Sequence, residues 1–240
     1  MEYSNYSIAP EIFTKFPGYV RGVVVAYEVT NGPSPPDLVQ LMREAESSVR
    51  ARLNLEKIAE EPLIKSWREA YRSFGAKPAE FRSSIEAMAR RALRGDELPS
   101  INALVDLGNI MSLRHVLPAG GHAIDLLKGD IELRFATGDE DFVAFGSEEL
   151  EHPLPGEVVF VENDTKTVLT RRWTWRQGKH TLLVPETTAL EFNVDGLPPI
   201  TRAEVEEAAA EVAELIKRFC GGTSRIDYLT AETPQVSLAP

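Results

Sequence analysis

The chain has 240 residues, 43% of them hydrophobic and 26% charged, which allows one large globular domain or two small ones. Its net charge of −11 argues against a protein that coats nucleic acid through bulk electrostatic attraction, and we expect no DNA partner. No apolar run is long enough to span a membrane, and the N-terminus lacks the pattern of a signal peptide. The single cysteine, Cys220, excludes an internal disulfide, so we expect a cytoplasmic protein without membrane association.

The first half of the chain predicts a strand followed by helices. Residues 19–29 are β-branched and aromatic, as is typical of a strand. Apolar residues recur at helical spacing from 38 to 53 and again from 63 to 74. A third helix is predicted between Pro78 and Gly95.

Charge is distributed unevenly along these helices. Residues 50–94 carry eleven Lys and Arg side chains against six acidic ones, a net charge of +5, which leaves −16 for the rest of the chain. A local basic surface of this kind can hold a few phosphate groups even on an acidic protein. A set of solvated helix faces is the alternative.

The second half predicts one more buried helix, a sheet and a last helix. The stretch SINALVDLGNIMSLRH, residues 100–115, reads as an apolar helix. Short apolar runs after residue 130 predict a mixed or antiparallel sheet, namely IELRFA, DFVAF, EVVFVE, TVLTRRWTW and HTLLVPE. Thr201 and Glu204 form a capping box for the last helix, and residues 223–240 are predicted to be a loose tail. The fold class is therefore α+β.

The stretch LPAGGHAID places two glycines directly before His122. A metal site is disfavoured because no HExxH or CxxC motif supplies further ligands, and a phosphate loop is disfavoured because GxGxxG is absent. We expect Gly120 and Gly121 to form a turn with positive φ that projects His122 into a pocket. A structural histidine beside a tight turn remains the alternative.

Hydrolysis by a positioned water is the expected chemistry if this chain is an enzyme. Ser112 lies in a predicted helix without a nucleophile elbow, and Cys220 has no neighbouring base, so a covalent intermediate is not indicated. The candidate groups for positioning water are His122, Asp106, Asp125 and Glu186. Glu186 ends the strand-like run TLLVPE, although it is equally compatible with the rim of a cleft.

The stretch RRWTWRQG alternates cationic and aromatic residues. In a strand, Trp173 and Trp175 share one face, while Arg172, Thr174 and Arg176 share the other. Such an arrangement can stack a base and hold a phosphate. A core face backed by a solvated basic face is the alternative.

From about residue 66 to 197, the order of these segments resembles the B3/B4 domain of the bacterial phenylalanyl-tRNA synthetase β subunit, in a free-standing version without the synthetase body. The matching stretches are SFGAKPAEFRSSIEAMARRAL, LPSINALVDLGNIMSLRHVLPAGGHAID, IELRFATGDEDF, PGEVVFVENDTKTVLTRRWTWRQG and TLLVPETT. The resemblance implies a mixed α/β fold around a pocket. In the synthetase, that pocket hydrolyses tyrosine wrongly esterified to the tRNA for phenylalanine.

The resemblance also implies which residues form the pocket. VDLGN matches the family's VDxTN and gives Asp106 and Asn109, with Gly108 where the synthetase has threonine. HAID matches HAFD and gives His122 and Asp125, and Glu186 corresponds to the family's strand-ending glutamate only after a shift of two positions. We expect catalytic roles for His122, Asn109 and Glu186. The expected substrate-binding residues are Asp106, Gly108, Gly120, Gly121, Asp125, Trp175 and Arg176.

Two functions follow as hypotheses. The first is a trans-acting editing hydrolase that deacylates mischarged aminoacyl-tRNA without metal or other cofactor; the chain is not expected to be a complete aminoacyl-tRNA ligase. The second is a non-catalytic module that binds tRNA, another RNA or an amino-acid-like ligand. The expected organisation is a strand–helix extension (1–65), a B3/B4-like domain (66–200), a C-terminal helix of the same unit (201–222) and the tail.

Overall fold

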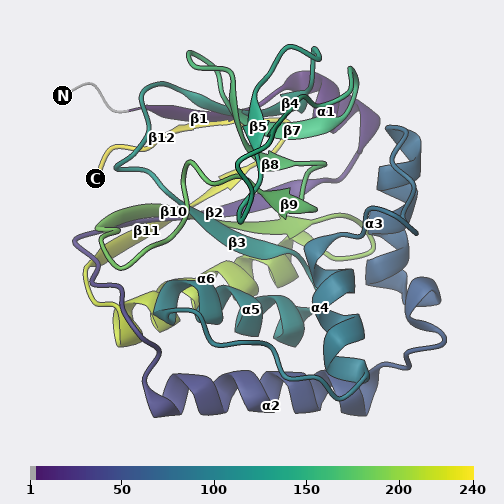
Figure 1. The fold of residues 1–240 in the computed structure, drawn as a ribbon, viewed down its shortest axis with the longest axis vertical. Coiled ribbons are helices and arrows are strands. Elements are labelled where there is room, and N and C mark those ends of the chain that lie inside the picture. The colour runs from purple at the N-terminus through teal and green to yellow at the C-terminus, as the bar shows by residue number, and fades with distance from the viewer. Residues whose placement is uncertain (1–3) are drawn as a thin grey trace.

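The computed structural model describes residues 4–240 and shows an α+β fold, which confirms the fold class expected from the sequence (Figure 1). Residues 1–3, at the start of the predicted N-terminal extension, lie outside the described residues. The helices are α1 (Pro10–Lys15), α2 (Pro36–Arg52), α3 (Pro62–Ser73), α4 (Ser84–Leu93), α5 (Ala103–His115) and α6 (Arg202–Phe219), with a short 3-10 helix at Ile58–Glu60.

Two main sheets are stacked on each other (Figure 1). The four-stranded sheet is antiparallel, in the order β11 (Thr223–Leu229), β2 (Val20–Tyr27), β10 (Ala189–Gly196) and β3 (Ala119–Ala123). The six-stranded sheet has the order β12 (Gln235–Ser237), β1 (Asn5–Ile8), β4 (Ile131–Phe135), β7 (Val158–Glu162), β8 (Thr167–Arg171) and β9 (Arg176–Gln177). Its β1–β4 pair is parallel, and a small hairpin joins β5 (Phe142–Val143) to β6 (Leu150–Glu151).

The helices form further layers beneath the four-stranded sheet. Helices α5 and α6 pack against it, and α2 packs on the outer side of α5 (Figure 1). The other face of the sheet looks toward the six-stranded sheet, as shown by the 2.7 Å hydrogen bond from the Tyr6 hydroxyl on β1 to Asn193 Oδ1 on β10. Side chains on this face of β2, β3 and β10 are therefore enclosed between two sheets. Within residues 4–240, no helix combines the length and apolar character needed to cross a bilayer.

Local capping explains where several helices begin. Asn102 accepts a hydrogen bond from the Val105 backbone N–H at the start of α5. The capping box predicted for the last helix is confirmed, because Thr201 and Glu204 bond reciprocally at the start of α6. The predicted start of the third helix at Pro78 is wrong: the Ser83 side chain caps α4, which begins at Ser84.

Two further expectations about local structure are wrong. Residues 223–240 are not a loose tail, because Thr223–Leu229 form β11 and satisfy the backbone groups along the edge of β2. The run HTLLVPE is not a strand, since a turn forms in which the Thr187 hydroxyl accepts from the Val184 N–H. The strand follows this turn, as β10, and pairs with β2 from the predicted extension. The domain boundaries at residues 65 and 200 stay predictions.

Candidate functional site

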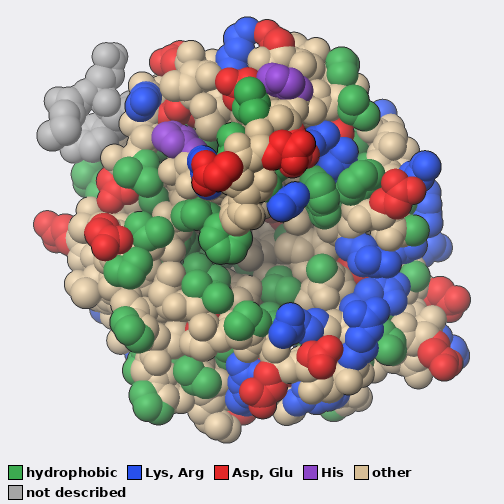
Figure 2. All heavy atoms as spheres, in the orientation of Figure 1, with side chains coloured by type: hydrophobic (Ala, Val, Ile, Leu, Met, Phe, Trp, Pro, Cys, Tyr) green, Lys and Arg blue, Asp and Glu red, His purple; other side chains and the backbone are tan. Residues whose placement is uncertain are grey.

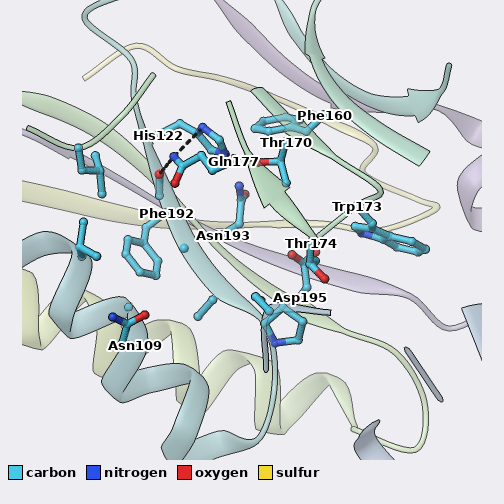
Figure 3. A pocket seen from close by; sticks show the side chains of 18 of the residues that line it. Asn109, His122, Phe160, Thr170, Trp173, Thr174, Gln177, Phe192, Asn193 and Asp195 are labelled. Atoms are coloured by element: carbon cyan, nitrogen blue, oxygen red, sulfur yellow. Dashed lines mark hydrogen bonds between the residues drawn. The ribbon is translucent and has the colours of Figure 1, made fainter. Parts of the chain in front are cut away.

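A cavity of about 220 Å³ opens between the two sheets and the helices α4 and α5. Figure 2 shows the hollow at the centre of the face drawn there, with Lys and Arg side chains gathered along one side of it. Its walls come from segments far apart in sequence, among them β2, α4, α5, β3, β7, the β8–β9 region and β10. Figure 3 shows His122, Asn193, Phe192 and Asn109 around this space.

One wall is a buried polar network on the inner face of β2 and β10. Arg21 Nε lies 2.7 Å from Asp195 Oδ1, and both side chains are almost fully buried. The Tyr19 hydroxyl donates to the same carboxylate, and Arg21 also donates to the Tyr6 hydroxyl. Because a buried ion pair is tolerated only when its other polar atoms are satisfied, this network fixes Arg21 and Asp195 rigidly at the cavity.

Glu191 lies beside this network, and both its hydrogen bonding and its pKa are unusual for a carboxylate. Asn193 Nδ2 donates to Glu191 Oε1 at 3.1 Å, while Glu191 Oε2 is buried and has no hydrogen-bond partner among the described residues. Burial raises the pKa of Glu191 to about 8, a shift that Arg21 opposes and Asp195 reinforces. Glu191 is therefore mainly protonated at neutral pH, and its proton is a buried donor close to the cavity.

His122 lies on β3, opposite Glu191 of β10 in the sheet register, and its side chain reaches the cavity (Figure 3). Its Nδ1 is 2.7 Å from the Thr181 hydroxyl, and its Nε2 is 3.1 Å from the Thr170 hydroxyl. Burial, followed by the nearby charges of Arg21 and His180, lowers the pKa of His122 to about 3. The imidazole is therefore neutral throughout the physiological range, which excludes a resting imidazolium.

The opposite wall is apolar and centres on Phe192. A Cβ atom on Gly108 of α5 would meet Phe192 Cζ at 2.8 Å, and one on Gly121 of β3 would meet Phe192 Cδ2 at 2.9 Å. Two glycines therefore make room for one aromatic ring. Gly120 differs, because a Cβ atom there would meet nothing within 4 Å, so its backbone leaves space inside the cavity.

The structure brings together seven of the ten residues named from the sequence. Those that line the cavity are Gly108, Asn109, Gly120, Gly121, His122, Trp175 and Arg176. The expected turn at Gly120 and Gly121 is wrong, because both glycines lie in β3 and neither has positive φ. Strand pairing with β10, rather than a turn, presents His122.

The three carboxylates named from the sequence lie elsewhere. Asp106 is buried and accepts hydrogen bonds from Ser34, Ser100 and the backbone of Ile101. It therefore stabilises the segment that leads into α5. Asp125 is exposed and accepts from the backbone and the hydroxyl of Thr188. Glu186 is exposed in the turn before β10 and is not among the residues that line the cavity.

The tryptophan stretch also differs from the expected strand. Consecutive residues Arg172 and Trp173 have φ of 48° and 63°, an uncommon backbone conformation for residues with side chains. The resulting turn separates the two tryptophans. Both tryptophans line the cavity, but Trp173 is buried against Phe16 and other core rings, whereas Trp175 is half-buried.

The residues of the polar wall were not predicted from the sequence. The segment LEFNVD alternates apolar and polar residues over 190–195, which is a strand pattern with Glu191, Asn193 and Asp195 on one face. That alternation was a usable signal for β10. The partner, Arg21, is separated from Asp195 by 174 residues, so no local pattern relates the two. Among residues 4–240, no three His, Cys, Asp or Glu side chains gather closely enough to hold a metal ion.

Comparison with known proteins gives a family match and similarity to solved structures. Residues 66–221 match the family described as B3/4 domain. No curated protein matches the chain. A crystal structure of an N-terminal fragment of the phenylalanyl-tRNA synthetase beta-subunit from Pyrococcus horikoshii is similar at 12% identity and a TM-score of 0.44, covering 94% of this chain and 51% of that one. The present chain thus spans about half the length of that fragment.

Proposed function

This chain belongs to the B3/4 domain family, and from that premise we propose that it is an editing-type hydrolase acting on the ester of mischarged aminoacyl-tRNA. The observation that carries the proposal is a cavity in which a neutral His122 faces a fixed polar wall. The cavity of about 220 Å³ is many times the roughly 10–15 Å³ that a single water molecule needs, which leaves room for an amino-acid moiety beside an attacking water.

In this proposal His122 orients the reaction by hydrogen bonding. A conjugate acid with a pKa of about 3 makes the imidazole a weak base at neutral pH. An aminoacyl ester is already activated, however, so a positioned water and a donor for the developing oxyanion are sufficient. The threonine hydroxyls on both ring nitrogens hold the imidazole in place, so one of these two hydrogen bonds must open for the ring to contact the attacking water or the oxyanion.

Asn109 is the proposed donor on the other side of the cavity (Figure 3). It lies one residue after Gly108 on α5, is half-buried, and its amide lines the cavity. Removing a single oxyanion donor commonly lowers the rate constant about 10²–10³-fold. The proposal therefore keeps His122 and Asn109 of the expected catalytic trio and leaves out Glu186, which does not line the cavity.

Deacylation of a panel of mischarged aminoacyl-tRNAs tests the function. We expect the wild-type protein to release the amino acid from at least one of them, and His122→Ala and Asn109→Ala to slow this release. Asp125→Ala is the matched control, because its exposed carboxylate lies outside the cavity. Hydrolysis of none of the panel by the wild-type protein would contradict the proposal.

A binding module without catalysis is the second candidate, and the low pKa of His122 favours it because an efficient general base has a pKa near the working pH. Its signature is tRNA or amino-acid binding at equilibrium with no turnover. Binding to tRNA that weakens steeply with salt, without ester hydrolysis, would select this function over the first.

A further inference from the structure

The hydroxyl group of Thr170 contacts His122 at the wall of the cavity. Thr170 lies on β8 directly opposite Gln177 of β9, so the two side chains share one face of the six-stranded sheet. Both residues line the cavity, and Thr170 Oγ1 is 3.1 Å from His122 Nε2 (Figure 3). Within residues 4–240 the Thr170 hydroxyl has no other hydrogen-bond partner. The direction of this one hydrogen bond therefore decides what the hydroxyl offers to the cavity.

Gln177 indicates which ring nitrogen of His122 carries the proton. Its side-chain Nε2 donates to the Gly121 carbonyl at 3.1 Å, a hydrogen bond that the amide oxygen of Gln177 could not make. The same Nε2 lies 3.4 Å from His122 Nδ1, as the dashed lines in Figure 3 show. Because an N–H group of Gln177 faces Nδ1, that nitrogen has to be the acceptor of the ring.

Thr181 supports the same assignment from the other side of Nδ1. Its hydroxyl is fully buried, lies 2.7 Å from His122 Nδ1 and has no other hydrogen-bond partner within residues 4–240. A buried hydroxyl needs an acceptor for its proton, and Nδ1 provides one. The neutral imidazole has a single ring proton, which then lies on Nε2 and is donated to Thr170 Oγ1.

We propose that Thr170, with its hydroxyl oriented by His122, donates a hydrogen bond into the cavity to the carbonyl oxygen of the bound aminoacyl group. Oγ1 accepts from the imidazole, so its own proton is free for this bond, and a chain of hydrogen bonds strengthens each donor in it. His122 and Gln177 are then positioning residues, and neither hydrogen bond to the imidazole has to open. The inference rests on the proposed function, to which it adds a donor besides Asn109.

Proton–nitrogen NMR of the protein labelled in its histidines tests the direction of these hydrogen bonds without a substrate. We expect the His122 ring, assigned by the loss of its signals in His122→Ala, to be protonated at Nε2 at neutral pH. A ring protonated at Nδ1 would overturn the proposal, because Thr170 would then donate to Nε2 and have no proton left for the cavity.

The kinetics of deacylation test the donor itself. Thr170→Val should lower kcat about 10²–10³-fold, the usual loss for an oxyanion donor, and Thr170→Ser should restore most of it. Thr181→Val is the matched control: it removes the other hydroxyl that contacts the imidazole, and Thr181 does not line the cavity. It should lower kcat about 10-fold or less. An equal loss in the two valine variants, or an unchanged kcat in Thr170→Val, would overturn the proposal.

Binding separates this inference from the proposed function. The probes are 3′-aminoacylamino-3′-deoxyadenosines carrying the amino acids of the deacylation panel, because their amide keeps the carbonyl oxygen and resists hydrolysis. Thr170→Val should weaken their binding about 2- to 12-fold, and Thr170→Ser should not. This result in a protein that hydrolyses no aminoacyl-tRNA would support the donor while contradicting the hydrolase. No binding by the wild type, or equal affinity in all three proteins, would overturn the donor even if deacylation is observed.

Discussion

The two faces of β10 are equally buried and chemically opposite. Leu190, Phe192 and Val194 are apolar and face α5 and α6, whereas Glu191 and Asp195 belong to the polar face between the two sheets. A strand buried on both faces is usually apolar on both, because burying a charge costs several kcal/mol unless it is paired. Core packing alone therefore does not explain the polar face, two of whose residues, Asn193 and Asp195, line the cavity.

The wall of the cavity is divided in the same way between polar and apolar residues. The polar face supplies the paired charges of Arg21 and Asp195, with Glu191 buried beside them, and the apolar face supplies the Phe192 ring that occupies the space left by Gly108 and Gly121. Alternate residues of β10 thus provide the polar groups of the cavity wall and its apolar surface. Substitutions on the two faces should consequently have different signatures.

Asp195→Ala is expected to have the largest effect on stability. It removes the carboxylate that pairs with Arg21 and leaves a buried, uncompensated guanidinium, which commonly costs about 3–5 kcal/mol in the free energy of unfolding. Urea denaturation measures this change. Asp125→Ala, which removes an exposed carboxylate, should cost less than about 1 kcal/mol, and an equal loss in both variants would refute the distinction.

Glu191→Gln should change the pH dependence of stability. The folded pKa of about 8 lies above the ordinary value of 4.5, so the folded state keeps a proton that the unfolded state loses. The stabilisation is fully present below pH 4.5 and is lost as the pH rises through 8, with a slope of at most about 1.4 kcal/mol per pH unit.

Between pH 6.5 and 8, the effect of Glu191 on the free energy of unfolding can be measured separately from that of His122. The folded pKa of His122 is depressed from 6.5 to about 3, so its contribution to stability is lost only as the pH falls below 6.5. The free energy of unfolding of the wild type should decrease from pH 6.5 to 8, and that of Glu191→Gln should decrease less. Identical slopes would contradict a protonated Glu191.

Gly108→Ala should test the apolar face. Its new Cβ would lie 2.8 Å from Phe192 Cζ, and such overpacking commonly costs about 1–3 kcal/mol. Thermal unfolding measures the cost. The double variant Gly108→Ala/Phe192→Leu should show non-additive stability because the shorter side chain relieves the contact. Strict additivity would show that Phe192 does not limit this wall.

Gly120→Ala should have the smallest effect on stability and a distinct effect on the site. With open space around the added methyl group, we expect a change within about 0.5 kcal/mol in the free energy of unfolding. The methyl group nevertheless projects into the cavity, so ligand binding or deacylation should weaken. A stable Gly120→Ala protein with unaltered ligand binding and deacylation would place the reacting group elsewhere.

Local patterns in the sequence predicted much of the fold. The four central helices, the strand near residue 20 and the capping box at Thr201 depend on residues close in sequence, and the structure contains all of them. β11 was missed because its seven residues are mostly half-exposed and gain stability only by pairing with β2, about 200 residues earlier. Non-local pairing of this kind leaves little local signal.

The site was predictable where the motif residues lie on the cavity wall. His122, Asn109 and the three glycines came from two short segments that α5 and β3 place side by side. Glu186 was predicted at the end of a strand because the apolar run before it resembles one. In the structure this run leads into a turn closed by the Thr187 hydroxyl, and the strand begins only at residue 189. The positive φ angles at Arg172 and Trp173 turn the chain before Trp175. The sequence did not predict them, because positive φ is usually expected at glycine and neither residue is one.

The rate of aminoacyl-ester hydrolysis across pH 5 to 9, measured with wild-type protein and His122→Ala and corrected for spontaneous hydrolysis, tests the central claim most directly. We predict hydrolysis that depends on the protein, is slowed by His122→Ala, and shows no inflection near the ordinary histidine pKa of 6.5, because the folded His122 stays neutral down to about pH 3. Absence of protein-dependent hydrolysis at every pH would contradict the hydrolase, and an inflection near 6.5 that His122→Ala removes would contradict the proposed neutral, orienting role of His122.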